Sequence, residues 1–144
     1  MTYLEKINNL QKIYDFKIIK PLPHEKIERQ LSGLGLSSDF LEFYKVTNGL
    51  NYEWFVIFPL EDVSNIKNTW DSIQRANSPE KSKFGFDEAF LDRFVIFAEI
   101  GAGECGVFDK SDHSIWFETS GQFQKTDMNL ANFIEICLRE VQDL

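Results

Sequence analysis

The sequence predicts a single α+β domain whose sheet is antiparallel. Helical periodicity dominates the first half, short strand-like runs follow one another in the second half, and an amphipathic helix closes the chain. Helices and strands segregated in this way favour an antiparallel sheet over the alternating elements of a parallel one. The 144 residues are close to the commonest domain size, and no linker or repeat divides them. The predicted domain therefore spans residues 1–144.

The first half contains three predicted helices. Thr2 and Glu5 form a capping-box pattern ahead of a stripe of apolar residues at helical spacing, which is Leu4, Ile7, Leu10 and Tyr14. A short helix over 24–31 follows a proline, a residue that suits the first helical turn. The third helix lies within 37–49, between a Ser-Ser-Asp cap candidate and an Asn-Gly pair that favours a left-handed stop.

The middle of the chain changes period. An aromatic and β-branched run at 54–58, ended by a proline, predicts a buried strand. Apolar residues at steps of three and four predict a helix within 61–76. The polar segment 77–85 is typical of a surface loop, and 86–93 has room for one or two helical turns.

The second half reads as a meander of strands. Three predicted strands cover 94–100, 105–110 and 114–119, and a further short strand is expected at 122–125. Short turns separate them, so antiparallel hairpins are the economical connection. A helix begins at about Asn129. The phenylalanines expected to be buried together in the core are Phe43, Phe58, Phe97 and Phe133.

The charge favours a protein partner over nucleic acid. The net charge is −8, and it divides into −2 over residues 1–72 and −6 over residues 73–144. The segment 87–118 alone holds eight acidic residues against two basic ones. Nucleic acid would be repelled, because affinity for phosphate comes from lysine and arginine. An acidic face suits a basic partner, and the plainer alternative is that the charge only keeps the protein in solution.

The chain is predicted to be cytoplasmic. It starts with a charged, periodic segment instead of an apolar signal, and no apolar run is long enough to span a membrane. Cys105 and Cys137 are the only cysteines. Two distant thiols in a chain without a secretory signal are expected to stay reduced.

No segment carries a recognisable catalytic, cofactor or metal motif, so we predict neither enzyme activity nor a cofactor. No cysteine pair has the spacing of a zinc site. Cys105, Asp112 and His113 lie near one another across a predicted hairpin, but a buried inert thiol and an exposed turn histidine are the simpler interpretation. The glycine-bearing turn 101–104 lacks the lysine and the helix of a phosphate-binding loop.

Acidic turn residues and tryptophans are the candidates for partner binding. Glu104, Asp109 and Asp112 lie in predicted turns at sheet ends, where accessible acids can steer a basic partner. The three could also converge at one end of the sheet, as a hydrolase or calcium site would require, but charged turn residues are more simply read as solvated. The tryptophans lie on apolar faces and are expected in the core, although tryptophan is also enriched at binding hot spots. The candidate protein-binding residues are Glu104, Asp109, Asp112, Trp116, Glu118 and Trp54, and the third tryptophan is Trp70.

One set of motifs resembles the SUKH superfamily, which joins bacterial immunity proteins to fungal cell-wall synthesis regulators. The segment 36–49, LSSDFLEFYKVTNG, resembles the signature helix of that family, and 57–63, IFPLEDV, is similar to its following strand and turn. Later family motifs are resembled by 94–98, Asp109, Phe133 and Gly103-Glu104, where Glu104 stands in place of the family's aspartate. The resemblance covers about residues 25–140, with Ser37 in place of the family's proline.

The resemblance implies a curved antiparallel sheet of about four to six strands with helices packed around it. It also implies that the protein works by binding, because bacterial members commonly bind and silence toxins encoded beside them. We therefore expect an immunity protein for a cognate polymorphic toxin with a basic, nuclease-type domain, acting as a monomer or weak homodimer. The alternative is a regulatory scaffold domain unrelated to toxins.

Overall fold

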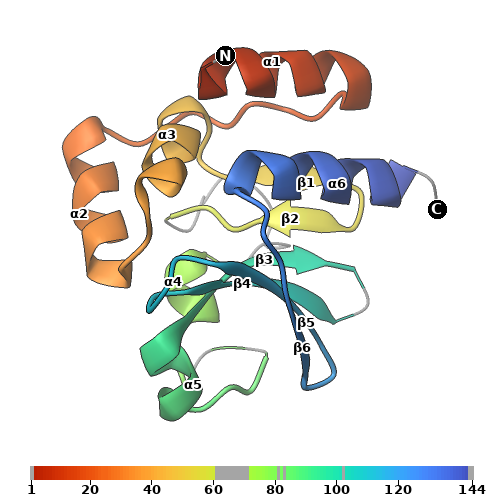
Figure 1. The fold of residues 1–144 in the computed structure, drawn as a ribbon. Helices are drawn as coiled ribbons and strands as arrows, with labels where there is room; N and C mark the ends of the chain where they lie inside the picture. Colours follow the sequence, from red (N-terminus) through yellow and green to blue (C-terminus); the bar gives the residue numbers. More distant parts are fainter. Residues whose placement is uncertain (1, 61–71, 81, 83, 102, 143–144) are drawn as a thin grey trace.

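A six-stranded antiparallel sheet in the order β1-β2-β3-β4-β5-β6 forms the centre of the molecule (Figure 1). The computed structural model describes residues 2–60, 72–80, 82, 84–101 and 103–142. The helices are α1 (Tyr3–Tyr14), α2 (His24–Leu34), α3 (Ser38–Val46), α4 (Ile73–Ala76), α5 (Glu88–Arg93) and α6 (Leu130–Gln142). The strands are β1 (Leu50–Tyr52), β2 (Phe55–Ile57), β3 (Phe94–Ile100), β4 (Glu104–Asp109), β5 (Ile115–Thr119) and β6 (Gln122–Lys125).

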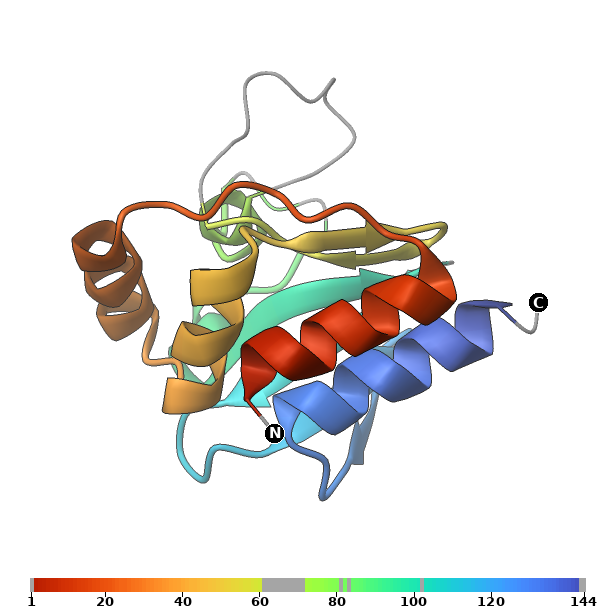
Figure 2. The same cartoon turned by 90° about the horizontal axis from the view of Figure 1, so that it is seen from above.

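The helices lie on both sides of this sheet. Helices α1 and α6 run side by side over one face, and α4 and α5 lie on the opposite side against β3 (Figures 1 and 2). The sheet is curved and does not close on itself, as Figure 1 shows. The predicted α+β class and the predicted curved antiparallel sheet are confirmed.

The helix starts follow the predicted caps. The Thr2 hydroxyl oxygen accepts a hydrogen bond from the Glu5 backbone N–H at 3.2 Å, as expected for a capping residue. Helix α2 runs three residues beyond the predicted end and stops at Gly35, whose φ of 72° is left-handed. Helix α3 does not end in the predicted left-handed stop, because its C-cap Thr47 has an extended backbone with φ of −150°. Asn48 Oδ1 instead accepts from the Leu60 N–H at 2.9 Å.

The predicted meander of strands is confirmed as β3 to β6, and two details of the first hairpin differ from the prediction. Strand β1 was not predicted, because three residues are too few to show an alternating pattern. Tyr52 pairs with Phe55, so Glu53 and Trp54 form the two-residue turn between β1 and β2. Trp54 therefore lies outside the buried strand in which the sequence placed it.

Part of the predicted middle helix lies outside the described residues. Of the segment 61–76, residues 61–71 and with them Trp70 are not described. The remainder forms α4, which Ser72 caps by accepting the Arg75 N–H at 3.2 Å. The described residues of 77–85 form neither helix nor strand, in line with the predicted loop.

Aromatic rings fill the interface between the helices and the sheet. The predicted core residues Phe43, Phe58, Phe97 and Phe133 are each at most 1% exposed, which confirms their burial. The Phe133 ring of α6 contacts rings on three strands, with centroid distances of 6.2 Å to Phe55, 5.1 Å to Phe97 and 5.3 Å to Phe117.

A glycine in β4 makes this close packing possible. A Cβ atom built on Gly106 would lie 2.6 Å from Cζ of Phe133 and 3.2 Å from both the Phe97 ring and the Ala98 Cβ. Contacts of 2.6 Å are repulsive, so the Phe133 ring occupies the space that a side chain at position 106 would need. The absence of a side chain in mid-strand is therefore a packing requirement.

The variant Gly106→Ala is expected to unfold more easily than the wild type by about 1–3 kcal/mol, because the added methyl group overpacks the core. Gly33→Ala is the matched control: a Cβ at this helical position meets nothing within 4 Å, and alanine is expected to stabilise a helix by about 1 kcal/mol relative to glycine. Urea unfolding of both variants measures the difference. Equal midpoints for Gly106→Ala and the wild type would contradict the packing argument.

Candidate protein-binding surface

Five of the six candidate residues fall into two groups at opposite ends of the sheet, and the sixth, Trp116, lies within β5 between them. Strand β4 begins at Glu104 and ends at Asp109, so the Cα atoms of these two residues are roughly 17 Å apart at about 3.3 Å per residue. Glu104 therefore does not converge with Asp109 and Asp112, which the sequence had left possible. We call one group the Trp54 end (Glu53, Trp54, Gly101, Gly103, Glu104, Glu118 and Glu140) and the other the Asp112 end (Arg93, Asp109, Ser111, Asp112, Ser114 and Lys125).

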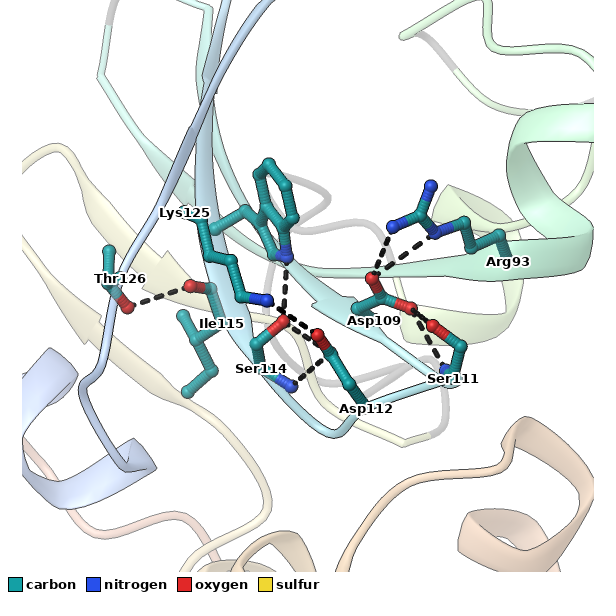
Figure 3. Close-up of polar contacts among 9 residues, drawn as sticks. Arg93, Asp109, Ser111, Asp112, Ser114, Ile115, Lys125 and Thr126 are labelled. Carbon is teal, nitrogen blue, oxygen red and sulfur yellow. Dashed lines mark hydrogen bonds and ion pairs between the residues drawn. The ribbon is translucent and has the colours of Figure 1, made fainter.

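At the Asp112 end, Asp109 is a buried structural residue. Its side chain is 0% exposed, and its Oδ2 accepts from Arg93 Nη2 at 2.8 Å and Nε at 3.2 Å (Figure 3). Its Oδ1 accepts from the backbone N–H of Ser111 at 2.9 Å and from the Ser111 hydroxyl at 2.6 Å. Burial raises the pKa of Asp109, but the hydrogen bonds from Arg93 and Ser111 outweigh it and hold the pKa below its usual value. The prediction that Asp109 is an accessible turn acid is wrong.

Asp112 is exposed but paired. Its Oδ2 accepts from Lys125 Nζ at 2.7 Å, and its Oδ1 accepts from the Ser114 backbone N–H at 3.0 Å (Figure 3). Lys125 and Ser114 hold the pKa of Asp112 well below its usual value. Each aspartate at this end thus faces a cation of its own chain.

An aromatic patch adjoins the Asp112 end on the same side of the sheet. Its members are Phe86, Phe90, Phe94, Trp116 and Phe123. Trp116 is half-buried and donates its Nε1 hydrogen to Ser114 Oγ at 2.8 Å, whereas Phe123 on β6 is 40% exposed. Arg93 lies 4.8 Å from the Phe94 ring centre and Lys125 lies 5.7 Å from that of Trp116, so basic groups already cover these rings.

At the Trp54 end, a tryptophan projects from a tightly held turn. Trp54 is 64% exposed, so its predicted place in the core is wrong and its place among the binding candidates fits its exposure. The Trp54 carbonyl accepts from the Gly101 N–H at 3.1 Å, and the Gly101 carbonyl accepts from the Glu104 N–H at 3.0 Å. A Cβ on Gly101 would lie 3.1 Å from Trp54 Cβ, so the two turns touch at the base of the indole.

Carboxylates at the Trp54 end repel one another. Burial raises the pKa of Glu104, and the charges of Glu140 and Glu118 raise it further. Within the described part of the chain, Glu104 and Glu140 form no ion pair with lysine or arginine. Glu118 is only 4% exposed and accepts from the Gly121 N–H at 2.7 Å, so its candidate role is that of a buried charge and not of a contact residue.

The cysteines and His113 stay apart. Cys105 and Cys137 are free and buried, and burial raises the pKa of the Cys137 thiol. Cys105 lies near the start of β4, whereas Asp112 and the exposed His113 lie beyond its other end, so the three do not meet. Among the described residues no group of three or more histidine, cysteine or carboxylate side chains is placed to hold a metal ion. In that same part of the chain, no helix has the length and apolarity needed to cross a membrane.

A groove between α1 and α6 was not predicted. It is lined by residues of both helices, among them Tyr3, Leu10 and Glu135. Ile13, which lines the groove, is 63% exposed. Leu4 of the same helix is 55% exposed, although it belongs to the predicted apolar stripe. The sequence does carry a signal for this apolar surface. Ile13 is apolar but lies outside the stripe of Leu4, Ile7, Leu10 and Tyr14, so α1 has apolar residues on more than one face.

The variant Asp109→Asn is expected to lose about 1–3 kcal/mol of stability at pH 7, because asparagine cannot pair with the Arg93 charge in a buried position. The folded pKa of Asp109 lies below its ordinary value of 3.8 in the unfolded chain. Its contribution to stability is therefore full well above that value and is lost as the pH falls from there through the folded pKa. The gap between wild type and variant in urea unfolding should therefore shrink on acidification. Asp112→Asn, at an exposed carboxylate, should cost less, and a gap that widens towards low pH would contradict this account.

The comparisons with known proteins give a family and no individual relative. No curated protein and no solved structure matches the chain. The model of the SMI1 / KNR4 family (SUKH-1) matches residues 24–135, which begin at the first residue of α2 and end within α6. The match thus takes in the whole sheet, both of its ends and the α3 helix whose signature the sequence shows. The chain belongs to the SMI1 / KNR4 family (SUKH-1).

Proposed function

We propose that this protein is an immunity protein that acts in the cytoplasm, where it binds and neutralises a cognate secreted polymorphic toxin with a basic toxin domain. The observation that carries the proposal is the Trp54 end, where an exposed tryptophan held by two turns lies near Glu104 and Glu140, which have no ion-pair partner among the described residues. Tryptophan is the residue type most enriched at binding hot spots. Members of the SUKH family typically bind partner proteins, so the proposal agrees with the family.

Binding alone would be sufficient for neutralisation. A toxin that cleaves nucleic acid must hold phosphates with lysine and arginine. An acidic protein that occupies those basic residues competes with the nucleic acid for the same groups, and the attraction between opposite charges speeds the encounter. The −8 net charge of the chain provides that attraction.

The second candidate is a regulatory scaffold, in line with the fungal regulators that the SUKH superfamily also contains. Such a protein would use the same surface for a partner other than a toxin. The gene beside this one separates the two candidates: a large reading frame that ends in a nuclease-like domain supports immunity, and its absence supports the scaffold.

Co-expression with the toxin domain encoded in the adjacent gene is expected to restore growth to cells that the toxin alone kills. The purified proteins should form a complex whose association rate falls with added salt, because screening acts over about 8–10 Å. A toxin inactivated at its active site serves as the growth control. Unprotected cells and the absence of a complex would refute the immunity function.

A further inference from the structure

We propose that the Trp54 end of the sheet is the docking surface for a basic protein partner, with the Trp54 indole as the apolar anchor of the interface. The inference rests on the proposed function, since the partner is taken to be the toxin domain. It departs from the expectation drawn from sequence, which assigned Asp109 and Asp112 to the same surface.

The backbone of Trp54 is held in place, whereas its side chain is exposed. Glu53 has a φ of 53°, a left-handed value that is uncommon for a residue other than glycine. The Gly101 turn fixes the next residue through the 3.1 Å hydrogen bond to the Trp54 carbonyl. An exposed indole on a fixed backbone loses little conformational entropy when a partner covers it, which is the property of a hot spot.

The electrostatic field at this end is negative for two independent reasons. Glu104 and Glu140 have no ion-pair partner among the described residues. Burial raises the pKa of Glu104, and the nearby charges of Glu140 and Glu118 add to that effect. In addition, α1 and α6 run in the same direction and both end on the side of the β1–β2 turn (Figure 2). Each helix therefore turns the negative end of its dipole to this surface. Lys12 and Arg139, in the last turns of these helices, offset part of that charge.

The Asp112 end does not fit the same partner. Its aspartates are satisfied by Arg93 and Lys125, and these cations lie against the Phe94 and Trp116 rings. A basic surface brought to this patch would meet arginine and lysine first, and like charges at an interface cost affinity. Charge complementarity thus selects the Trp54 end.

The chemistry of the surface defines the partner. Exposed carboxylates accept hydrogen bonds from lysine or arginine, and arginine forms the stronger, bidentate pairs. An arginine can also lie against the face of an exposed tryptophan ring. The predicted partner surface therefore carries arginines around an apolar spot large enough for an indole.

The test measures binding of variants to the toxin domain of the adjacent gene. Trp54→Ala is expected to weaken binding about tenfold or more, chiefly by faster dissociation. Leu4→Ala is the matched control, because Leu4 is 55% exposed but lies at the other end of α1. The double variant Glu104→Gln/Glu140→Gln should slow association several-fold at low salt and much less at high salt. Glu25→Gln/Glu28→Gln on α2 makes the same change in net charge on the side of the molecule away from the Trp54 end (Figure 1).

A second measurement uses the wild-type chain and does not depend on how any variant folds. Hydroxyl-radical labelling of Trp54 should fall when the toxin domain binds, while labelling of Phe123 in the aromatic patch stays unchanged. Unaltered binding of the Trp54 variant, equal effects of the two double variants, or protection of Phe123 in place of Trp54 would each overturn the inference.

The docking surface at the Trp54 end can be tested even if the proposed immunity function is refuted. If wild-type protein neither protects cells nor binds the toxin domain, the immunity function is refuted, and hexa-arginine at low salt becomes the probe. Its titration should move the NMR signals of the Trp54 indole and the Glu104 amide, with the indole signal assigned through Trp54→Phe. Shifts confined to the Trp116 indole and the Asp112 amide, or no shifts, would overturn the inference on the docking surface.

Discussion

The fit of Phe133 against Gly106 is the constraint on which the rest of the fold depends. Because the Phe133 ring occupies the space above Gly106, α6 approaches the centre of the sheet closely enough to touch three strands at once. Helix α1 then lies beside α6, and α3 packs against α1. The position of α6 also sets the direction in which its C-terminal turn, and with it Glu140, meets the end of the sheet.

The meander topology places the candidate binding residues at two opposite ends of the sheet. In an antiparallel sheet without crossovers, successive turns lie at opposite ends. The Glu53–Trp54 turn therefore shares an end with the β3–β4 turn, while Asp112 in the β4–β5 turn lies at the other. Residues close in sequence, such as Glu104 and Asp109, are thereby separated by the length of a strand. Residues far apart in sequence, such as Trp54 and Gly101, are brought into contact. The candidate surface is thus a product of strand pairing.

The sequence predicted the elements better than it predicted the environments of side chains. Caps such as Thr2 and the strands of the second half follow from local patterns, and the burial of Phe133 follows from helical periodicity. The exposure of Trp54 could not be predicted in this way, because it depends on whether the chain turns at position 53 or one residue later. The burial of Asp109 depends on Arg93, sixteen positions earlier, whose side chain reaches it only after β3 and β4 pair.

Net charge is therefore a poor guide to where a partner binds. The segment 87–118 holds eight acidic residues, yet Asp109 and Asp112 there are neutralised by cations of the same chain. Glu140 lies outside that segment and still adds to the negative field around Glu104. Carboxylates that the fold has already paired gain little from a partner, whereas those that repel one another lose that repulsion when a cation arrives. This is why we place the proposed docking surface where the folded chain has left like charges together.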